Sequence, residues 1–308
     1  DTDDDDDDYR YSLVGYMTLY HFISLFHKPE GGIIVRICQA LLLPPYQGQG
    51  HGGRLIRALY KLAGGGTGAE GSDQTPDDKS SSISSSHYKI VQINVEDPAP
   101  GFVALRNKTD SHYVFENLSR WNELEPNWPS QTMCQLFEPT MKGKTETETE
   151  TSNVDTTDIK SDIKTMLDDG HLFTPMSEND TMYASAISKL TIRQIQIVRE
   201  ILVLWKLSRY FDISELDGGS SPSAISKTGG SGIEQDSSNK EEFQNMKSEL
   251  FKKARLMIKR RLNKENRDEL TSLPTKEEQK SQLSKLFAAE SKHYMKIISS
   301  LKKKIVQQ

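Results

Sequence analysis

The chain has 308 residues, with 44 acidic against 39 basic side chains and a hydrophobic share of 35%. This length accommodates two domains of ordinary size, while the low hydrophobic share indicates that part of the chain does not pack into a core. The small acidic excess does not favour direct nucleic-acid binding. The two distant cysteines, Cys38 and Cys134, form neither a disulfide framework nor a zinc pattern, and no apolar run is long enough to cross a membrane.

The chain opens on an acidic run, residues 3–8, and passes directly into a strand-like segment. We therefore expect that the protein is N-terminally incomplete here. A solvated loop is the simpler interpretation of the acidic run, and attraction of a basic peptide is the alternative.

Two strands joined by a turn are expected first. Residues 9–26 are rich in aromatic and β-branched side chains, and residues 33–43 form a second apolar run that two prolines end. They predict an antiparallel hairpin. A helix follows, in which Leu55, Ile56, Leu59 and Leu62 recur at helical spacing, and residues 88–95 then alternate as a strand does.

Low-complexity segments divide the rest of the chain. We predict a first domain over residues 1–140 with a disordered insertion at 64–86, a linker over 141–157, and a helical domain over 158–308 with a Gly/Ser linker at 217–240. In that domain we expect a small antiparallel bundle of helices at 191–210, 241–262 and 283–305. The first of these should bury one stripe, formed by Ile192, Ile195, Val198, Leu202 and Trp205.

A glycine-rich turn carries the first chemical argument. Between the second strand and the helix lie Gln47, Gly48, Gln49, Gly50, His51, Gly52 and Gly53. The backbone N–H groups of such a turn, together with the positive end of the helix, favour a pyrophosphate. The P-loop Lys-Ser/Thr and the dinucleotide spacing are both missing. On its own, the pattern is equally consistent with a simple connection between strand and helix.

With its flanks, the turn resembles a known family. Residues 43–52 read Leu-Pro-Pro-Tyr-Gln-Gly-Gln-Gly-His-Gly, which is similar to the coenzyme A loop of the type B histone acetyltransferases in the GNAT superfamily. Residues 14–20, 95–98 and 255–262 resemble other segments of that family in the same order. The resemblance implies an α/β fold, in which a GNAT acetyltransferase core with a mixed, largely antiparallel sheet and helices precedes a small C-terminal helical bundle.

The resemblance also implies a cosubstrate, acetyl-coenzyme A, and no metal. Residues 47–53 would bind its pyrophosphate, and the backbone of Ala40, Leu41 and Leu42 would pair with its pantetheine arm. Tyr20, His21 and Phe22 match the family's histone-contacting strand, although a further strand of the sheet is the simpler interpretation of them.

The implied base is Glu96. A lysine ammonium must lose a proton before its nitrogen can attack a thioester, and a positioned carboxylate can take that proton. Asp97 would assist or hold Glu96 in place. Without the resemblance, residues 96–98 indicate only an acidic turn. The acetyl group would pass directly to lysine, and we interpret Cys38 as a packed thiol rather than a nucleophile.

The implied substrate is the N-terminal tail of newly made histone four, with histone three as its dimer partner. A WD40-repeat histone-binding protein would be the usual partner, in nucleus and cytoplasm. The basic residues 252–264 are either an import signal or nucleic-acid patch, or the solvated face of a bundle helix. Two alternatives stay open: an acetyltransferase for another amine, and a non-catalytic module that binds coenzyme A or holds a histone–chaperone assembly together.

Overall fold

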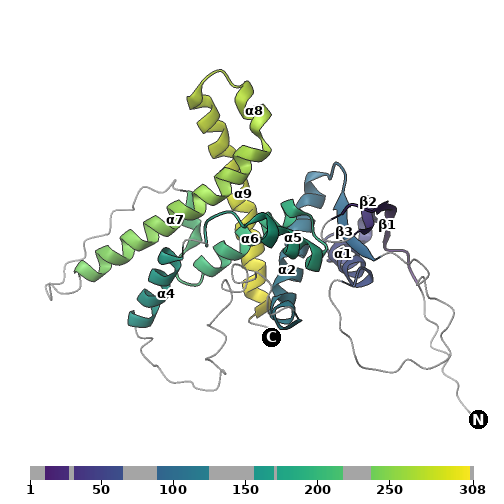
Figure 1. Ribbon diagram of the computed structural model, residues 1–308, viewed down its shortest axis with the longest axis horizontal. Helices are drawn as coiled ribbons and strands as arrows, with labels where there is room; N and C mark the ends of the chain where they lie inside the picture. The colour runs from purple at the N-terminus through teal and green to yellow at the C-terminus, as the bar shows by residue number, and fades with distance from the viewer. Residues whose placement is uncertain are drawn as a thin grey trace, which may run out of the picture. The chain divides into compact units, whose positions relative to one another are not determined.

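The computed structural model describes residues 11–27, 31–64, 89–124, 156–169, 172–217 and 237–305 (Figure 1). The strands are β1 (Gly15–Ser24), β2 (Gly32–Leu42) and β3 (Ile90–Val95). The longer helices are α1 (His51–Leu62), α2 (Pro100–Leu124), α4 (Thr156–Asp168), α5 (Glu178–Ser188), α6 (Ile192–Leu207), α7 (Ser237–Glu265) and α9 (Lys276–Ile305). Short helical segments are η1 (Pro44–Tyr46), η2 (Ile213–Asp217) and α8 (Arg267–Ser272). Within these residues, no helix combines the length and apolar character that a membrane span needs.

The chain divides into two compact units. The first contains residues 1–109 and 185–191, and the second contains residues 110–184 and 192–308. The acidic run at 3–8, the insertion at 64–86 and the linkers at 141–157 and 217–240 lie wholly or mostly outside the described residues. Those assignments, and the domain boundaries drawn from them, therefore stay predictions.

The first unit contains a three-stranded mixed sheet of order β1-β2-β3. β1 pairs with β2 antiparallel, which confirms the predicted hairpin, and β2 pairs with β3 in parallel. A parallel pair requires a crossover connection, and α1 lies within it. The mixed α/β class is therefore correct, and the sheet holds one antiparallel and one parallel pair. A complete acetyltransferase core stays a prediction.

The core of the first unit lies between the central strands and α1. Val35 of β2 and Ile93 of β3 are fully buried, and α1 buries Ile56, Leu59 and Tyr60 at helical spacing. The predicted helix is confirmed, but Leu62, at its last position, is 74% exposed. Leu62 lies on the far side of the helix from Ile56 and Tyr60, so the apolar stripe continues through those residues instead.

Residues outside the strands cap the outer edge of β3 at Ile93. The N–H of Ile93 donates to the carbonyl of Lys189 at 2.8 Å, and the Arg106 guanidinium donates to the carbonyl of Ile93 at 2.8 Å. Both backbone groups of Ile93 are therefore satisfied by residues outside the strands. No periodicity in the sequence indicates this pairing.

In the second unit, α6 is buried on most of its surface. Its buried residues include apolar ones on every side and also two charged ones, Arg199 and Glu200. The expectation of a single buried stripe was therefore too narrow. It was also wrong for Ile192, which is 47% exposed because it starts the helix before the packed part begins.

Helices α7 and α9 run in opposite directions. Early in α7, Lys247 pairs with Glu215 of η2 at 2.6 Å, and late in α9 the Lys302 ammonium donates to the carbonyl of Ser208 at 2.7 Å. Further along α7, the Lys259 ammonium lies 5.3 Å from the ring centroid of Phe287, in the first half of α9. This is the antiparallel arrangement expected from the sequence.

A buried ionic cluster joins α6, α7 and α9. Nε of Arg261 lies 3.0 Å from both carboxylate oxygens of Glu200, and its Nη atoms donate to Glu265 at 2.9 Å and Glu290 at 2.8 Å. The Tyr294 hydroxyl donates to Glu200 at 2.8 Å. The side chains of Arg261 and Glu200 are only 6% and 4% exposed. At Arg261, the basic helix therefore does not face solvent.

Burial also perturbs the titration of this cluster. Desolvation raises the pKa of Glu200 to about 7, against the charge and hydrogen bonds of Arg261. The folded state therefore holds a proton that the unfolded chain releases at lower pH. The stabilisation that this proton provides is complete below the ordinary carboxyl range and is lost as the pH rises through about 7.

Arg261→Met should destabilise the protein strongly at pH 8, where Glu200 is mostly ionised. The substitution leaves a buried carboxylate without its cation, at a cost of about 3–5 kcal/mol in the free energy of unfolding. Urea denaturation measures this. The double variant Arg261→Met with Glu200→Met should recover much of the loss, because both charges are then absent. A single-variant cost below about 1 kcal/mol would contradict the role assigned to the ion pair.

Glu200→Gln should change how stability depends on pH. Between pH 5 and pH 8, the unfolding free energy of the unsubstituted protein should fall relative to that of Glu200→Gln, which has no proton to lose at this position. Urea midpoints measured across this range test the prediction. Parallel curves for the two proteins would show that Glu200 does not titrate there.

Candidate functional site

The second half of β2 has a partner on only one edge. β2 pairs with β1 as far as Leu42, but it pairs with β3 only as far as Ile37, which lies opposite Val95. Within the described part of the chain, residues 38–42 therefore have no strand partner on this edge, where only the Leu42 carbonyl accepts a side-chain hydrogen bond, from Gln47. This stretch includes Ala40, Leu41 and Leu42. A free strand edge can accept an extended ligand by backbone pairing.

A β-bulge marks the place where the free edge begins. Thr18 pairs with Gln39 and Leu19 with Ile37, so Cys38 is the extra residue on β2. Cys38 is exposed, and its thiol is 3.7 Å from the carbonyl of Arg36. The prediction of a packed thiol was therefore wrong, because alternation along a strand does not survive an inserted residue.

The glycine-rich turn follows η1 and leads directly into α1. Gly48 and Gly50 adopt φ of 75° and 85°, in the left-handed region, and a Cβ at either would meet no atom within 4 Å. Two glutamines brace the turn. The side-chain amides of Gln47 and Gln49 donate to the carbonyls of Leu42 at 2.9 Å and Pro45 at 2.8 Å. The predicted strand–turn–helix setting is confirmed.

The turn presents unused backbone donors. α1 begins at His51, so His51, Gly52 and Gly53 form its first helical turn rather than part of a loop. Its N-cap, Gly50, offers no side-chain cap. Among the described residues, the N–H groups of residues 48–53 have no protein acceptor. Open donors at the positive end of a helix form a site suited to an anionic group such as a phosphate.

Gly52 serves packing rather than turn conformation. A Cβ at this position would lie 2.7 Å from Cδ2 of Leu105 in α2 and 3.4 Å from Cδ1 of Leu42. Its absence lets the start of α1 approach both the end of β2 and α2. The two glycines of the motif therefore have different roles. Gly50 allows the left-handed backbone, and Gly52 allows close packing.

Glu96 is the first residue after β3, beside the point where β2 and β3 separate. Its side chain is 64% exposed and forms an ion pair with Arg36 at 2.5 Å. Asp97, the next residue, is exposed and has φ of 43°, a left-handed conformation that is uncommon outside glycine. The turn at Asp97 redirects the chain into α2. Glu96 thus lies at the open end of the sheet, held by one cation.

Strand register places two of the three predicted histone-contacting residues on the face that carries Glu96. Tyr20 is paired with Arg36, and Arg36 is paired with Asn94, two residues before Glu96. The Arg36 guanidinium carbon lies 5.1 Å from the Phe22 ring centroid, and the Tyr20 and Phe22 centroids are 6.3 Å apart. Alternation puts His21 on the opposite face.

Arg36 was missed in the sequence, where it is one polar residue in an apolar run. Only the parallel register reveals that it lies between the aromatic pair and Glu96. Of the predicted site residues, the structure brings Glu96, Tyr20 and Phe22 together through Arg36. Residues 40–42 and 47–53 form a continuous path from the free edge to the start of α1.

Comparison with known proteins bears on this arrangement. No family model matches the chain. Proteins named histone acetyltransferase type B catalytic subunit do match. One from Dictyostelium discoideum is 36% identical over 111 residues, 36% of this chain and 18% of the relative. One from Kluyveromyces lactis is 32% identical over 136 residues, 40% of this chain and 30% of the relative. One from Rattus norvegicus is 30% identical over 97 residues, 32% of this chain and 17% of the relative.

Over about a third of its length, the chain is homologous to type B histone acetyltransferase catalytic subunits. The resemblance inferred from the sequence is therefore confirmed. These relatives are by name acyltransferases that act on histones. The chain spans less than a third of the length of each of the three relatives. The roles of individual residues of the homologous chain stay predictions.

Gly50→Ala should destabilise the protein by about 1–2 kcal/mol, because a Cβ strains the left-handed conformation at this N-cap. Gly101→Ala is the matched control. Gly101 lies in the first turn of α2, where a Cβ meets no atom within 4 Å, so alanine should be neutral or slightly stabilising there. Urea denaturation compares the two variants, and equal stabilities would refute the conformation assigned to Gly50.

Proposed function

We propose that this chain forms the acetyl-coenzyme A-binding part of a type B histone lysine acetyltransferase. The observation that carries the proposal is the homology together with a free strand edge that leads into an uncapped, glycine-rich helix start. Backbone pairing and anion binding are the two interactions that a long pantetheine–pyrophosphate ligand needs, and here they occur in the right succession.

The described residues fit such a ligand. The open N–H groups of residues 48–53 would hold the pyrophosphate, because Gly48 and Gly50 leave no Cβ in its way. Ala40, Leu41 and Leu42 would pair with the extended arm, and a strand amide there would polarise the carbonyl that is attacked. When bound, acetyl-coenzyme A would supply the acetyl group as a thioester, which is activated for transfer to an amine.

Glu96 would accept the proton from the substrate lysine. Its carboxylate is accessible at the end of β3, so an incoming ammonium can reach it. Arg36 would act as a positioning residue, since it holds Glu96 and also stacks on Phe22. Asp97 would fix the turn from which Glu96 projects. The lysine nitrogen would then form the new bond to the acetyl carbon, and the carbon–sulfur bond would break with coenzyme A leaving as its thiolate. The remaining extra proton on nitrogen would neutralise that thiolate, and no covalent acyl-enzyme is needed.

The substrate would be the tail of histone four, bound with histone three, with a WD40-repeat histone-binding protein as partner, in nucleus and cytoplasm. The aromatic pair Tyr20 and Phe22 supports peptide binding, because both rings lie on the Glu96 face. His21, on the other face, has no such support. A different amine substrate, or a coenzyme A-binding scaffold without activity, would be compatible with the same loop.

Glu96→Gln should lower turnover on a histone-four tail peptide by about 100-fold or more, because it removes the proton acceptor. Acetylation of the peptide is followed by mass spectrometry, and acetyl-coenzyme A binding by calorimetry. Binding should stay within about twofold of the unsubstituted chain, since the change does not touch the loop. Glu178→Gln, an exposed change at the start of α5, is the matched control and should alter neither quantity.

The same measurements separate the alternatives. Transfer to small amines but not to the histone peptide would point to a different substrate, and binding without any transfer would point to the scaffold. Failure of the chain to bind acetyl-coenzyme A would exclude both acetyltransferase hypotheses, for a histone and for another amine. Unchanged turnover in Glu96→Gln would show that Glu96 is not the base.

A further inference from the structure

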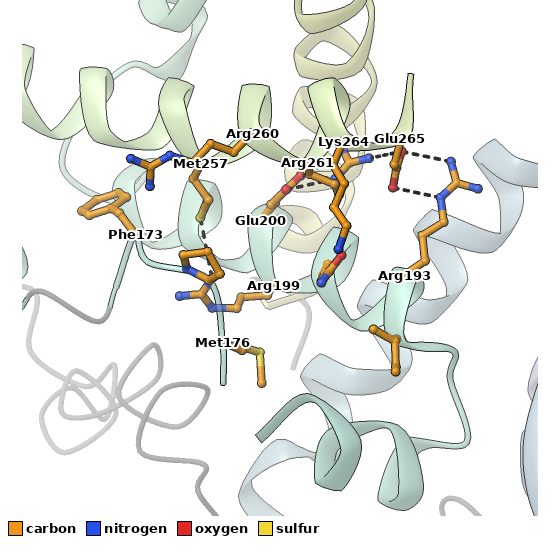
Figure 2. Close-up of a pocket in the computed structure, with 13 residues that line it drawn as sticks. Phe173, Met176, Arg193, Arg199, Glu200, Met257, Arg260, Arg261, Lys264 and Glu265 are labelled. Atoms are coloured by element: carbon orange, nitrogen blue, oxygen red, sulfur yellow. Dashed lines mark hydrogen bonds and ion pairs between the residues drawn. The ribbon is translucent and has the colours of Figure 1, made fainter. Parts of the chain in front are cut away.

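The second unit contains a pocket that shares no residue with the candidate acetyl-transfer site. It has a volume of about 560 Å³ and lies between α6, α7 and residues 173–176 (Figure 2). That volume is within the range of sites that hold a ligand of several connected groups. It is far larger than an inorganic anion requires.

The apolar part of the pocket is preformed. Phe173 and Met257 are only 6% and 7% exposed, and Pro175, Met176 and Ile192 complete the apolar lining. Methionine side chains adapt to the shape of a bound group. Ile192 stays 47% exposed at the start of α6, although it is a large apolar residue on a well-packed helix. The pocket therefore offers an apolar surface that an apolar side chain could cover.

The charged part of the pocket is cationic. Arginine and lysine outnumber glutamate among its lining residues. Its two carboxylates already have cations, because Glu200 is bonded to Arg261, and Glu265 is bonded to both Arg193 and Arg261. Both carboxylates of the pocket are therefore paired with arginines that also line it.

Two cations are left over. Among the described residues, neither Arg260 nor Lys264 forms an ion pair or a hydrogen bond. They are four residues apart on α7, a spacing at which like charges repel. In Figure 2, Arg260 extends toward the side of Phe173, whereas Lys264 extends across toward α6. Their side chains therefore extend in different directions in this view, so two separated anionic groups would suit them better than one.

A neutral polar group completes the lining. Gln196 faces the pocket from α6 and, within the described part of the chain, makes no hydrogen bond. Its carboxamide carries one acceptor oxygen and a donor NH₂, the complement of a peptide group's N–H and C=O. A peptide backbone can satisfy it on both sides, whereas an alkyl chain cannot.

We propose that this pocket binds an acidic peptide segment of a partner protein. An apolar side chain of the segment covers Ile192 and Met257, carboxylates on either side of it pair with Arg260 and Lys264, and the backbone between them bonds to Gln196. An inorganic phosphate leaves the apolar lining uncovered. A fatty acid has a single carboxylate and no backbone amide, so it leaves one cation and Gln196 without partners.

The test uses fluorescence anisotropy with the full 308-residue chain and a fluorescein-labelled Gly-Glu-Leu-Phe-Glu-Gly peptide. Two comparison peptides replace either both glutamates by lysine or both apolar residues by serine. Binding of the first peptide should be at least about tenfold tighter than binding of either comparison peptide, because each loses one of the two recognition elements. Equal binding of the serine peptide would overturn the proposal, since charge alone would then explain it.

Substitutions locate the site. Arg260→Glu with Lys264→Glu should weaken binding by about tenfold or more. The matched control is Lys252→Glu with Lys285→Glu, exposed cations outside the pocket, which should bind as the unsubstituted chain does. Circular dichroism verifies that both double variants are folded. Ile192→Ser and Gln196→Ala should each weaken binding as well. Equal binding by the two double variants, or full competition by laurate at the peptide's own affinity, would overturn the proposal.

Discussion

The candidate site depends on one constraint, which is that β2 has two neighbours over only half of its length. β3 ends at Val95, opposite Ile37, whereas β1 accompanies β2 to Leu42. Beyond that point, one side of the sheet offers free backbone and the other offers Glu96. The open end of a parallel pair is where ligands of α/β sheets commonly bind. The turn at Gly50 follows the end of the same free edge. The ligand path and the position of the proposed base therefore both result from the early end of β3.

Features that depend on local backbone conformation could be predicted from the sequence. Features that depend on which strands or helices pair could not. Gly50 could be singled out because its left-handed backbone is a local property of the turn. Gly52 belongs to the same motif, but the contact with Leu105 that requires a glycine there is not local. Arg36 could not, because its contact with Glu96 depends on the register between β2 and β3. Cys38 was assigned to the interior because a single extra residue reverses the alternation on which that prediction rests. Ile192 matched the helical period but lies ahead of the packed part of α6.

The basic helix α7 shows why composition is a poor guide to the role of a charge. Arg261 lies inside the second unit and is satisfied by carboxylates from three helices, whereas its neighbour Arg260 has no described partner. Periodicity predicted that a helix exists here and that it is amphipathic. It could not tell which cation is structural, because the partners Glu200 and Glu290 come from distant parts of the chain. Three-dimensional proximity alone separates a fixed cation from one that is available to a ligand.

The closure of β3 by Lys189 has a consequence for the order in which the protein is made. Ile93 leaves the ribosome long before Lys189 does, so during synthesis the outer edge of β3 stays without this hydrogen bond. Exposed strand edges are templates for pairing with other chains. The first unit therefore gains this hydrogen bond only after residues 110–184 of the second unit have been synthesised. Non-local closure of this kind slows folding, and until residues 185–191 emerge this part of the β3 edge is open to pairing with other chains.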